Sequence, residues 1–151
     1  MLLSEFLPAA NVRLPILATD KPSLLRELTE FLAARDGGDA TRLHDAVAER
    51  ESALGTGIGH WVAVPHGRSE GIAGLRVVAG RTDHPVPFDA ADGEPVRLVF
   101  LVVGPPADAG RHVQVLGRIE RLAQREEFRA RLLAAESAAA FADVIRESEE
   151  H

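Results

Sequence analysis

Apolar residues recur at helical spacing in some segments of the chain and in short continuous runs in others. This pattern predicts an alternation of helices and strands. Residues 2–7 are expected to form a short helical turn. Five longer helices are predicted. The first has Asp20 or Thr19 as its cap and stops at Gly37-Gly38, and the second has Asp39 or Thr41 as its cap and Arg50 and Glu51 in its last turn. The other three are Gly110 to Ala123, Glu126 to Ala134, and a last helix capped by Ser137.

Four strands are also predicted. They cover Val12 to Leu14, ended by Pro15, then Trp61 to Val64, Leu75 to Ala79 and Val96 to Val103. The run from Val96 to Val103 is almost continuously apolar, as expected of a central strand covered on both faces. The segment His84 to Asp89 and the pair Asp92-Gly93 indicate loop and turn. The pattern predicts one α/β domain over residues 1–151, a layered fold with a mixed parallel and antiparallel sheet flanked by helices.

The composition and charge of the chain limit which kinds of partner it can be expected to bind. The chain has 151 residues, 46% of them hydrophobic and 26% charged, which is ordinary for one globular domain. Its net charge of −6, with histidine neutral, disfavours nucleic acid or an anionic membrane as the main partner, because both select for basic faces. Lys21 is the only lysine, so arginine carries nearly all the positive charge, and arginine suits bidentate contacts to phosphate.

The absence of cysteine excludes disulfides, thiolate catalysis and sulfur-ligated zinc. No apolar run approaches the ~18 residues of a transmembrane helix, so no membrane insertion is expected. Glu5 and Pro8 interrupt the N-terminal apolar stretch, and no basic leader precedes it. We therefore expect no signal peptide and a cytoplasmic location.

The stretch from Arg50 to Arg68 holds the strongest candidate for chemistry. After a helix and a loop with glycine at every second position, it follows the apolar run from Trp61 to Val64 and stops at Pro65-His66-Gly67. His66 is expected at the mouth of a strand, because proline cannot donate to a sheet and glycine marks a turn. A neutral imidazole there can accept a phosphoryl group if a backbone carbonyl fixes its tautomer and donors surround the phosphoryl oxygens. The alternative is a loop histidine without a role.

Two other residues are candidates for binding a phosphoryl group. Arg50 lies at a predicted helix end just before the glycine loop, where its guanidinium could reach a phosphate through two parallel bonds. The alternative is a solvated arginine favourably placed at a helix C-terminus. His112 is expected in the first turn of a helix, where unpaired N–H groups attract anions, and it could bond a phosphoryl oxygen. The alternative for His112 is an exposed helix-start residue.

The glycine loop, Gly55 to Gly59, could bring backbone N–H groups near a phosphate, and Gly57 and Gly59 are expected to shape that phosphate site. Thr56 is expected to shape the loop through a bond to the backbone. The loop follows a helix and opens a strand, and it lacks a Gly-Lys-Ser/Thr ending. It is therefore neither a P-loop nor a dinucleotide fingerprint.

A zinc site is the remaining alternative, since the fold could bring His60, His66 and His112 together. No His-Glu-x-x-His helix and no cysteine pair is present, so we predict no metal. The aromatic residues expected in the core are Trp61, Phe100 and Phe128.

The same stretch resembles the signature of enzyme IIA of the fructose, mannitol and nitrogen-regulatory class in the bacterial sugar phosphotransferase system. The order is Arg50-Glu51, then Thr56-Gly57-Ile58-Gly59, a strand and Pro65-His66, with a helical histidine, His112, further on. The resemblance covers nearly the whole chain. It continues through Asp92-Gly93-Glu94-Pro95-Val96, Gly110-Arg111-His112-Val113-Gln114-Val115-Leu116, Phe128-Arg129-x-x-Leu132 and Ala138 to Ile145.

The resemblance implies a mixed sheet flanked by helices and no cofactor. It also implies that His66 carries the phosphoryl group through a phosphohistidine intermediate, with His112 and Arg50 beside it. The implied donor is the histidine-containing phosphocarrier protein. The implied receiver is a cysteine of a IIB domain, or else the group is held as a signal, as in nitrogen-regulatory members. The alternative is a regulatory binding module whose affinity for a target protein is switched by phosphorylation of His66.

Two positions depart from the family pattern. His60 stands where the family usually has glycine or a small polar residue, so a third imidazole is expected to border the site. Gly104 to Gly110 is a loop of small residues that could shape the choice of partner. The chain has no IIB cysteine and no membrane domain, so we expect a free-standing IIA unit or a piece of a system whose other parts are separate.

Overall fold

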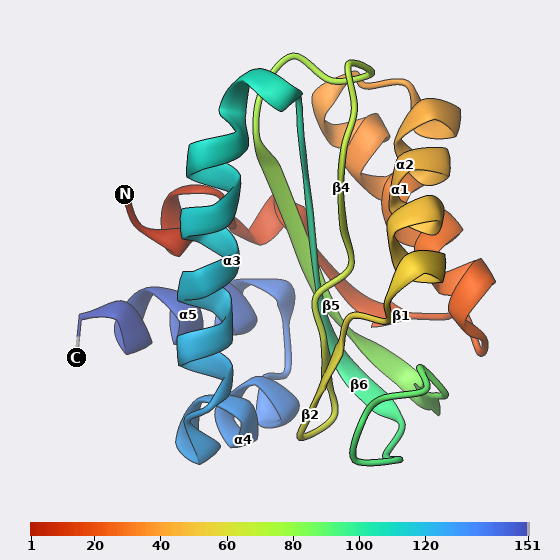
Figure 1. The fold of residues 1–151 in the computed structure, drawn as a ribbon. Helices are drawn as coiled ribbons and strands as arrows, with labels where there is room; N and C mark the ends of the chain where they lie inside the picture. The colour runs from red at the N-terminus through yellow and green to blue at the C-terminus, as the bar shows by residue number, and fades with distance from the viewer. Residues whose placement is uncertain (151) are drawn as a thin grey trace.

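In the computed structural model, which describes residues 1–150, a six-stranded mixed sheet lies between two layers of helices (Figure 1). One face is covered by α1 (Lys21–Asp36) and α2 (Ala40–Ala53). The other is covered by α3 (Ala109–Ala123), α4 (Glu126–Ala134) and α5 (Ala138–Glu149). The predicted α/β layered architecture is confirmed. Within residues 1–150, no helix combines the length and the apolar character needed to cross a membrane.

The helices begin where the sequence predicts. The carboxylate of Asp20 accepts a hydrogen bond from the N–H of Ser23 at 2.8 Å and caps α1. Asp39 and Ser137 cap α2 and α5 in the same way. Each cap satisfies a backbone donor that the first turn leaves unpaired. Helix α1 ends at Gly37, whose φ of 74° is a left-handed conformation that suits glycine.

The strands form a sheet in the order β1-β5-β6-β3-β2, with β4 also paired to β6. Their bounds are β1 (Val12–Ile16), β2 (Gly57–Gly59), β3 (Val62–Ala63), β4 (His66–Arg68), β5 (Arg76–Val86) and β6 (Val96–Gly104). β1 runs parallel to β5, and β3 and β4 both run parallel to β6. The pairs β5–β6 and β2–β3 are antiparallel. The sheet is thus mixed, as predicted.

Strand β6 is central and covered on both faces, which explains its continuous apolar run. Its side chains alternate between two cores, because successive residues of a strand point to opposite faces. Leu98, Phe100 and Val102 belong to the core under α3, α4 and α5. Val99, Leu101 and Val103 belong to the core under α1 and α2.

Two predicted strands continue past their expected ends, and each continuation contains a proline. Pro15 lies inside β1, where it is exposed. β1 is an edge strand, and an edge strand tolerates the missing donor of proline. β5 continues through His84 and Pro85 to Val86, a segment that we expected to be a loop. The register shifts between Arg81 and Val86, so the exposed residues before Val86 belong to an irregular strand end.

The predicted core is right for two aromatic residues and wrong for the third. Phe100 and Phe128 are buried and stack with their ring centroids 6.4 Å apart. Trp61 is 44% exposed. It lies in the two-residue turn of the β2–β3 hairpin with a φ of 68°, and this turn holds it outside the core.

Candidate functional site

His66 is the first residue of β4, and the strand that we expected to end before it continues in a second segment. β3 and β4 pair in sequence with the same edge of β6, with His66 opposite Val102. Pro65 lies between them, and its carbonyl accepts a bond from the N–H of Val102 at 3.1 Å. Pro65 therefore keeps one hydrogen bond to β6 through its carbonyl and lacks only the bond that a backbone N–H would donate. The break between the two segments places His66 at a fixed position of the sheet, half-buried.

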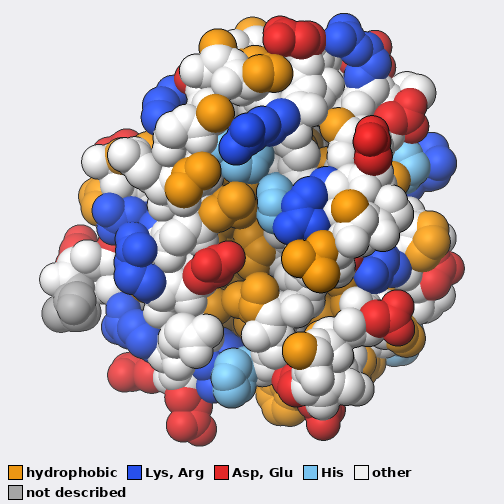
Figure 2. All heavy atoms as spheres, in the orientation of Figure 1, with side chains coloured by type: hydrophobic (Ala, Val, Ile, Leu, Met, Phe, Trp, Pro, Cys, Tyr) orange, Lys and Arg blue, Asp and Glu red, His pale blue; other side chains and the backbone are white. Residues whose placement is uncertain are grey.

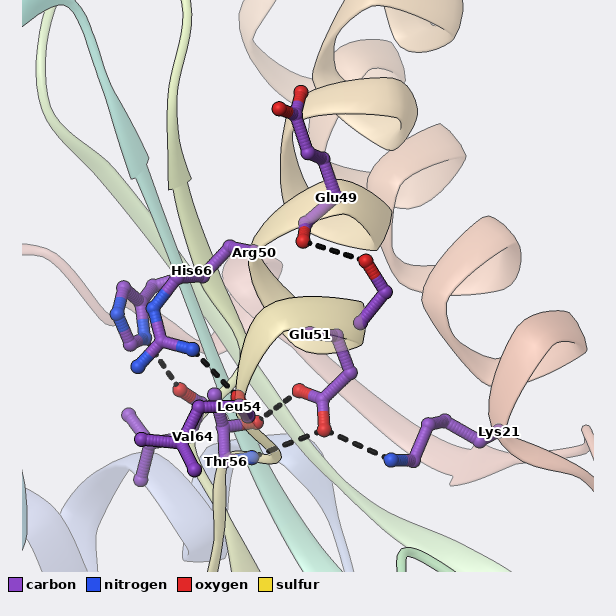
Figure 3. Close-up of polar contacts among 9 residues, drawn as sticks. Lys21, Glu49, Arg50, Glu51, Leu54, Thr56, Val64 and His66 are labelled. Carbon is purple, nitrogen blue, oxygen red and sulfur yellow. Dashed lines mark hydrogen bonds and ion pairs between the residues drawn. The ribbon is translucent and has the colours of Figure 1, made fainter.

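The His66 ring is oriented by a backbone carbonyl. Its Nδ1 lies 2.8 Å from the carbonyl oxygen of Val64 (Figure 3). A carbonyl can only accept, so Nδ1 carries the proton and Nε2 keeps the lone pair. Burial lowers the pKa of His66 below its ordinary value, and the charge of Arg50 acts in the same direction, against the Val64 bond. At neutral pH the ring is therefore neutral, with a free nucleophilic nitrogen.

His112, in the first turn of α3, faces His66. The ring centroids are 5.7 Å apart and the ring planes make an angle of 67°. His112 is only 2% exposed, so the alternative of an exposed helix-start residue is wrong. Neither of its ring nitrogens has a hydrogen-bond partner among the described residues. Burial lowers its pKa to about 4, with the charges of His66 and Arg68 adding to the effect.

These two rings line a pocket of about 210 Å³ between α2, β4 and α3. Its walls are formed by Ala46, Arg50, His66, Gly67, Arg68, His112 and Leu116. On this face of the molecule two histidine side chains lie close together beside arginine side chains, in a hollow between α2 and α3 (Figure 2). The structure thus brings together His66, His112 and Arg50, as the sequence predicted.

Two arginines from different elements line this pocket. Arg50 comes from the last turn of α2, and its Nη1 donates to the carbonyl of Leu54, which anchors the guanidinium at the end of the helix (Figure 3). Arg68 is exposed and comes from β4, two residues after His66. Sequence reasoning missed Arg68, although side chains two apart on a strand share a face. Two guanidinium groups supply the charge and donors that a phosphoryl dianion needs.

The closeness of α2 and β4 depends on Gly67. A Cβ atom at this position would lie 3.0 Å from the backbone carbon of Ala46 and 3.0 Å from the backbone nitrogen of Val47. Only a residue without a side chain allows this approach. The contact brings the last turns of α2, and with them Arg50, up to the His66 strand.

Thr56 connects the glycine loop to the end of α2 through two hydrogen bonds to Glu51. Its backbone N–H donates to the Glu51 carboxylate at 2.9 Å, and its hydroxyl donates to the same carboxylate (Figure 3). Lys21 pairs with Glu51 at 2.9 Å. We expected the Thr56 hydroxyl to bond the backbone, so its partner is a correction. Glu51, which is 6% exposed, fastens the glycine loop to the end of α2, a role that its place in the sequence did not predict.

Gly57, Gly59 and His60 do not join the pocket around His66. Gly57 packs against Ala90, since a Cβ at Gly57 would lie 2.9 Å from the Cβ of Ala90. Gly59 has a φ of 88° and His60 a φ of 56°, and these left-handed residues turn the β2–β3 hairpin. His60 lines a different pocket, so the expectation of a third imidazole at the site is corrected. Within residues 1–150, no three or more histidine, aspartate or glutamate side chains are grouped so as to hold a metal ion.

Sequences similar to this chain include two proteins named for fructose and one named for nitrogen regulation. The chain is 32% identical over 140 residues to the PTS system fructose-specific EIIA component of Haloferax volcanii, and the match covers 89% of this chain and 91% of that protein. It is 31% identical over 140 residues to the nitrogen regulatory protein of Bradyrhizobium diazoefficiens, covering 92% of each. It is 31% identical over 148 residues to the PTS system fructose-specific EIIABC component of Bacillus subtilis, where the match covers 97% of this chain and 23% of that protein.

A solved structure and a family model agree with these relatives. The crystal structure of nitrogen regulatory protein IIA-Ntr from Neisseria meningitidis superposes with a TM-score of 0.88 at 29% identity, covering 95% of this chain and 98% of that one. Residues 5–148 match the family model described as "Phosphoenolpyruvate-dependent sugar phosphotransferase system, EIIA 2". The chain therefore belongs to the EIIA 2 family of the phosphoenolpyruvate-dependent sugar phosphotransferase system.

Proposed function

We propose that this protein is a phosphoryl carrier that accepts a phosphoryl group on Nε2 of His66 from the histidine-containing phosphocarrier protein. It then passes the group to a IIB partner or holds it as a regulatory signal. The observation that carries the proposal is the fixed tautomer of His66, whose Nδ1 is bonded to the Val64 carbonyl at 2.8 Å in a pocket shared with two arginines. Membership of the EIIA 2 family supports it.

The chemical step needs no proton transfer at His66. The Nε2 lone pair attacks phosphorus as the bond between phosphorus and the donor's histidine nitrogen breaks, and that bond's electron pair returns to the donor ring. Nδ1 keeps its proton, and the Val64 carbonyl stabilises the positive charge that develops on the phosphorylated ring. In the second transfer a nucleophile of the receiver, a cysteine thiolate in a IIB partner, attacks phosphorus as the bond between phosphorus and Nε2 breaks, and the electron pair of that bond returns to Nε2 of His66.

The pocket stabilises the charge on the phosphoryl group in transit. Transfer of this kind depends on positioning and on charge stabilisation of the phosphoryl oxygens. Arg50 and Arg68 line the pocket as cations, and His112 lines it as a neutral ring with unpartnered nitrogens. A phosphoryl oxygen that accepts the N–H of His112 would give this buried donor the partner that it lacks among the described residues.

The surroundings of the pocket suit a protein partner. Leu54 at the end of α2 is 70% exposed, and Val113, next to His112 on α3, is 60% exposed. Two large apolar side chains beside an open pocket favour contact with another protein over contact with water. This agrees with a donor and a receiver that are both proteins.

The test is labelling with phosphoenolpyruvate, enzyme I and the phosphocarrier protein, read by intact mass and peptide mapping. We expect one phosphoryl group, on His66, and none on His66→Ala. His84→Ala is the matched control, because His84 is an exposed histidine on β5 outside the pocket, and it is expected to label normally. Labelling that persists in His66→Ala would refute the assignment.

A purely regulatory role is the second candidate, because relatives named for fructose and for nitrogen regulation match the chain at 32% and 31% identity. In this case the protein is labelled but does not discharge to a IIB protein. Comparing the partners captured by the native protein and by His66→Asp separates the two roles. Identical partners for both proteins, together with discharge to a IIB protein, would count against a regulatory switch.

A further inference from the structure

A second and larger pocket lies at the opposite end of the hairpin from His66. Its volume is about 440 Å³, against about 210 Å³ for the pocket at His66. Its walls come from the β2–β3 turn, the turn before β6, and α4, and are formed by His60, Trp61, Asp92, Glu94, Glu126, Arg129, Ala130 and Leu133. Figure 1 shows the tip of this hairpin beside α4, away from the ends of α2 and α3 that border His66. None of these residues lines the pocket at His66.

Trp61 gives this pocket an aromatic wall. Trp61 is 44% exposed, although tryptophan is highly buried on average. The neighbouring apolar wall is supplied by Ala130 and Leu133 of α4. The pocket therefore offers an aromatic surface and an aliphatic surface to the same ligand.

The facing wall is held in place by Asp92. One carboxylate oxygen accepts the backbone N–H of His60 at 3.0 Å, and the other accepts that of Glu94 at 3.1 Å. These bonds lower the pKa of Asp92, because both favour the charged form. The turn before β6 is thus fastened to the hairpin that carries Trp61, and the two walls are positioned before any ligand arrives.

The charges around the pocket favour a cation. Three carboxylates, those of Asp92, Glu94 and Glu126, face one guanidinium, that of Arg129. Arg129 is already engaged, because its Nη1 donates to the carbonyl of Ala123 at 2.7 Å. Glu94 and Glu126 are both exposed, and the ion pairs among residues 1–150 include neither of them. An aromatic face beside free carboxylates is the combination that binds organic cations.

We propose that this pocket binds an organic cation, a guanidinium or ammonium group on an apolar stem, with the charge between Glu94 and Glu126 and the stem against Trp61. A metal ion is not the expected ligand, because no three of the described histidine and acidic side chains are grouped to hold one. The cation could be a free small molecule or an arginine or lysine side chain of a partner protein. The proposal does not depend on phosphoryl transfer at His66.

The protein contains its own reporter for this site, because Trp61 is its only tryptophan and it has no tyrosine. We would titrate the native protein with n-butylguanidine and follow the tryptophan fluorescence. n-Butylurea is the matched control, since it has the same shape without the charge. We expect a saturable change with half-saturation on the order of 1 mM for the guanidine, and at least fivefold weaker binding of the urea. Equal binding of the two compounds, or no saturable change with either, would overturn the proposal.

Neighbouring glutamates of α4 provide a matched pair of variants. Glu126 lines the pocket and Glu127 does not, yet both are exposed acidic residues in the first turn of the same helix. Glu126→Gln is expected to weaken n-butylguanidine binding about threefold, and the double variant with Glu94→Gln about tenfold. Glu127→Gln is expected to leave binding unchanged. Equal weakening by Glu126→Gln and Glu127→Gln would show a general effect of charge and would overturn the site.

The source of the cation is tested with a capped Ala-Ala-Arg-Ala-Ala peptide. Tighter binding of this peptide than of n-butylguanidine assigns the pocket to an arginine of a partner protein. Weaker binding assigns it to a free small molecule. Both results support a cation site, and the same peptide with glutamine in place of arginine must fail to bind.

Discussion

The two helix ends that border the His66 pocket each bury a polar side chain, but they treat it in opposite ways. Glu51, in the last turn of α2, is 6% exposed and is bonded to the Thr56 backbone, the Thr56 hydroxyl and Lys21. His112, in the first turn of α3, is 2% exposed, and neither ring nitrogen has a partner among the described residues. The Glu51 carboxylate is thus fully bonded within the protein, whereas the His112 ring has no hydrogen-bond partner among the described residues.

This difference separates holding the fold from binding a ligand. A buried polar group that is fully bonded contributes to stability, and its removal leaves its partners without a hydrogen bond. A buried polar group without partners costs stability, and it is retained where a ligand or a reaction supplies the missing bond. We therefore expect changes at Glu51 to affect folding first and changes at His112 to affect phosphoryl transfer first.

The largest expected effect is at Glu51. Glu51→Ala leaves the Lys21 ammonium and two donors of Thr56 without an acceptor, and we expect the free energy of unfolding to fall by roughly 4 kcal/mol. Urea denaturation measures this loss. Glu49→Ala is the control, because Glu49 is an exposed glutamate on the same helix. If the two variants lose equal stability, Glu51 is not the anchor that we infer.

The second effect is a dependence of stability on pH at His112. Its pKa falls from 6.5 to about 4 on folding, so between these values the unfolded chain binds a proton that the folded protein does not. The free energy of unfolding must therefore fall as the pH is lowered from 6.5 towards 4. We expect a contribution on the order of 2 kcal/mol, absent from His112→Leu. Parallel stability profiles for the two proteins across this range would contradict the assignment.

The third effect concerns phosphoryl transfer. His112→Leu removes a donor from the pocket without stranding any partner, so we expect transfer to slow by roughly thirtyfold while stability holds or rises by about 1 kcal/mol. His112→Gln keeps an N–H donor and is expected to recover part of the rate. The measurement is the rate of His66 labelling in rapid-quench experiments. A His112→Leu protein that loses stability but is labelled at the native rate would contradict this role for His112.

The smallest effect is at Arg68, which is exposed and screened by water. Arg68→Gln is expected to slow labelling of His66 about fivefold, because one of two cations near the phosphoryl oxygens is lost. The effect should shrink at high ionic strength. Arg111→Gln is the control, since Arg111 is exposed at the start of α3 but lies outside the pocket. Equal slowing by both changes would mean that Arg68 acts only through the general charge of the protein.

The fold was largely readable because its signals are local. Caps at Asp20, Asp39 and Ser137 and the continuous apolar run of β6 depend on nearby residues, and all four are confirmed. The errors at Pro15 and Pro85 have a tertiary cause. Whether a proline ends a strand depends on whether its missing donor faces a neighbouring strand, and that pairing is set by distant parts of the chain.

The site was only partly readable for a related reason. The sequence pointed to His66, His112 and Arg50, but exposure of a side chain depends on what packs against it. His112 is buried because α3 lies against the sheet, and Trp61 is exposed because left-handed residues turn its hairpin outwards. Arg68 was detectable from its spacing to His66 alone. The place of His60 was not, because it follows from backbone angles rather than from any pattern of residue types.

Gly67 gives the pocket a mechanical property. Because the α2 backbone lies where a methyl group on residue 67 would stand, the separation between the Arg50 helix and the His66 strand is set by direct contact of main chains, with no flexible side chain in between. Contact of this kind resists compression, because the two main chains cannot approach further. An incoming phosphoryl group would then meet a pocket that cannot become narrower, so differences in speed between donor proteins should not arise from compression of the pocket.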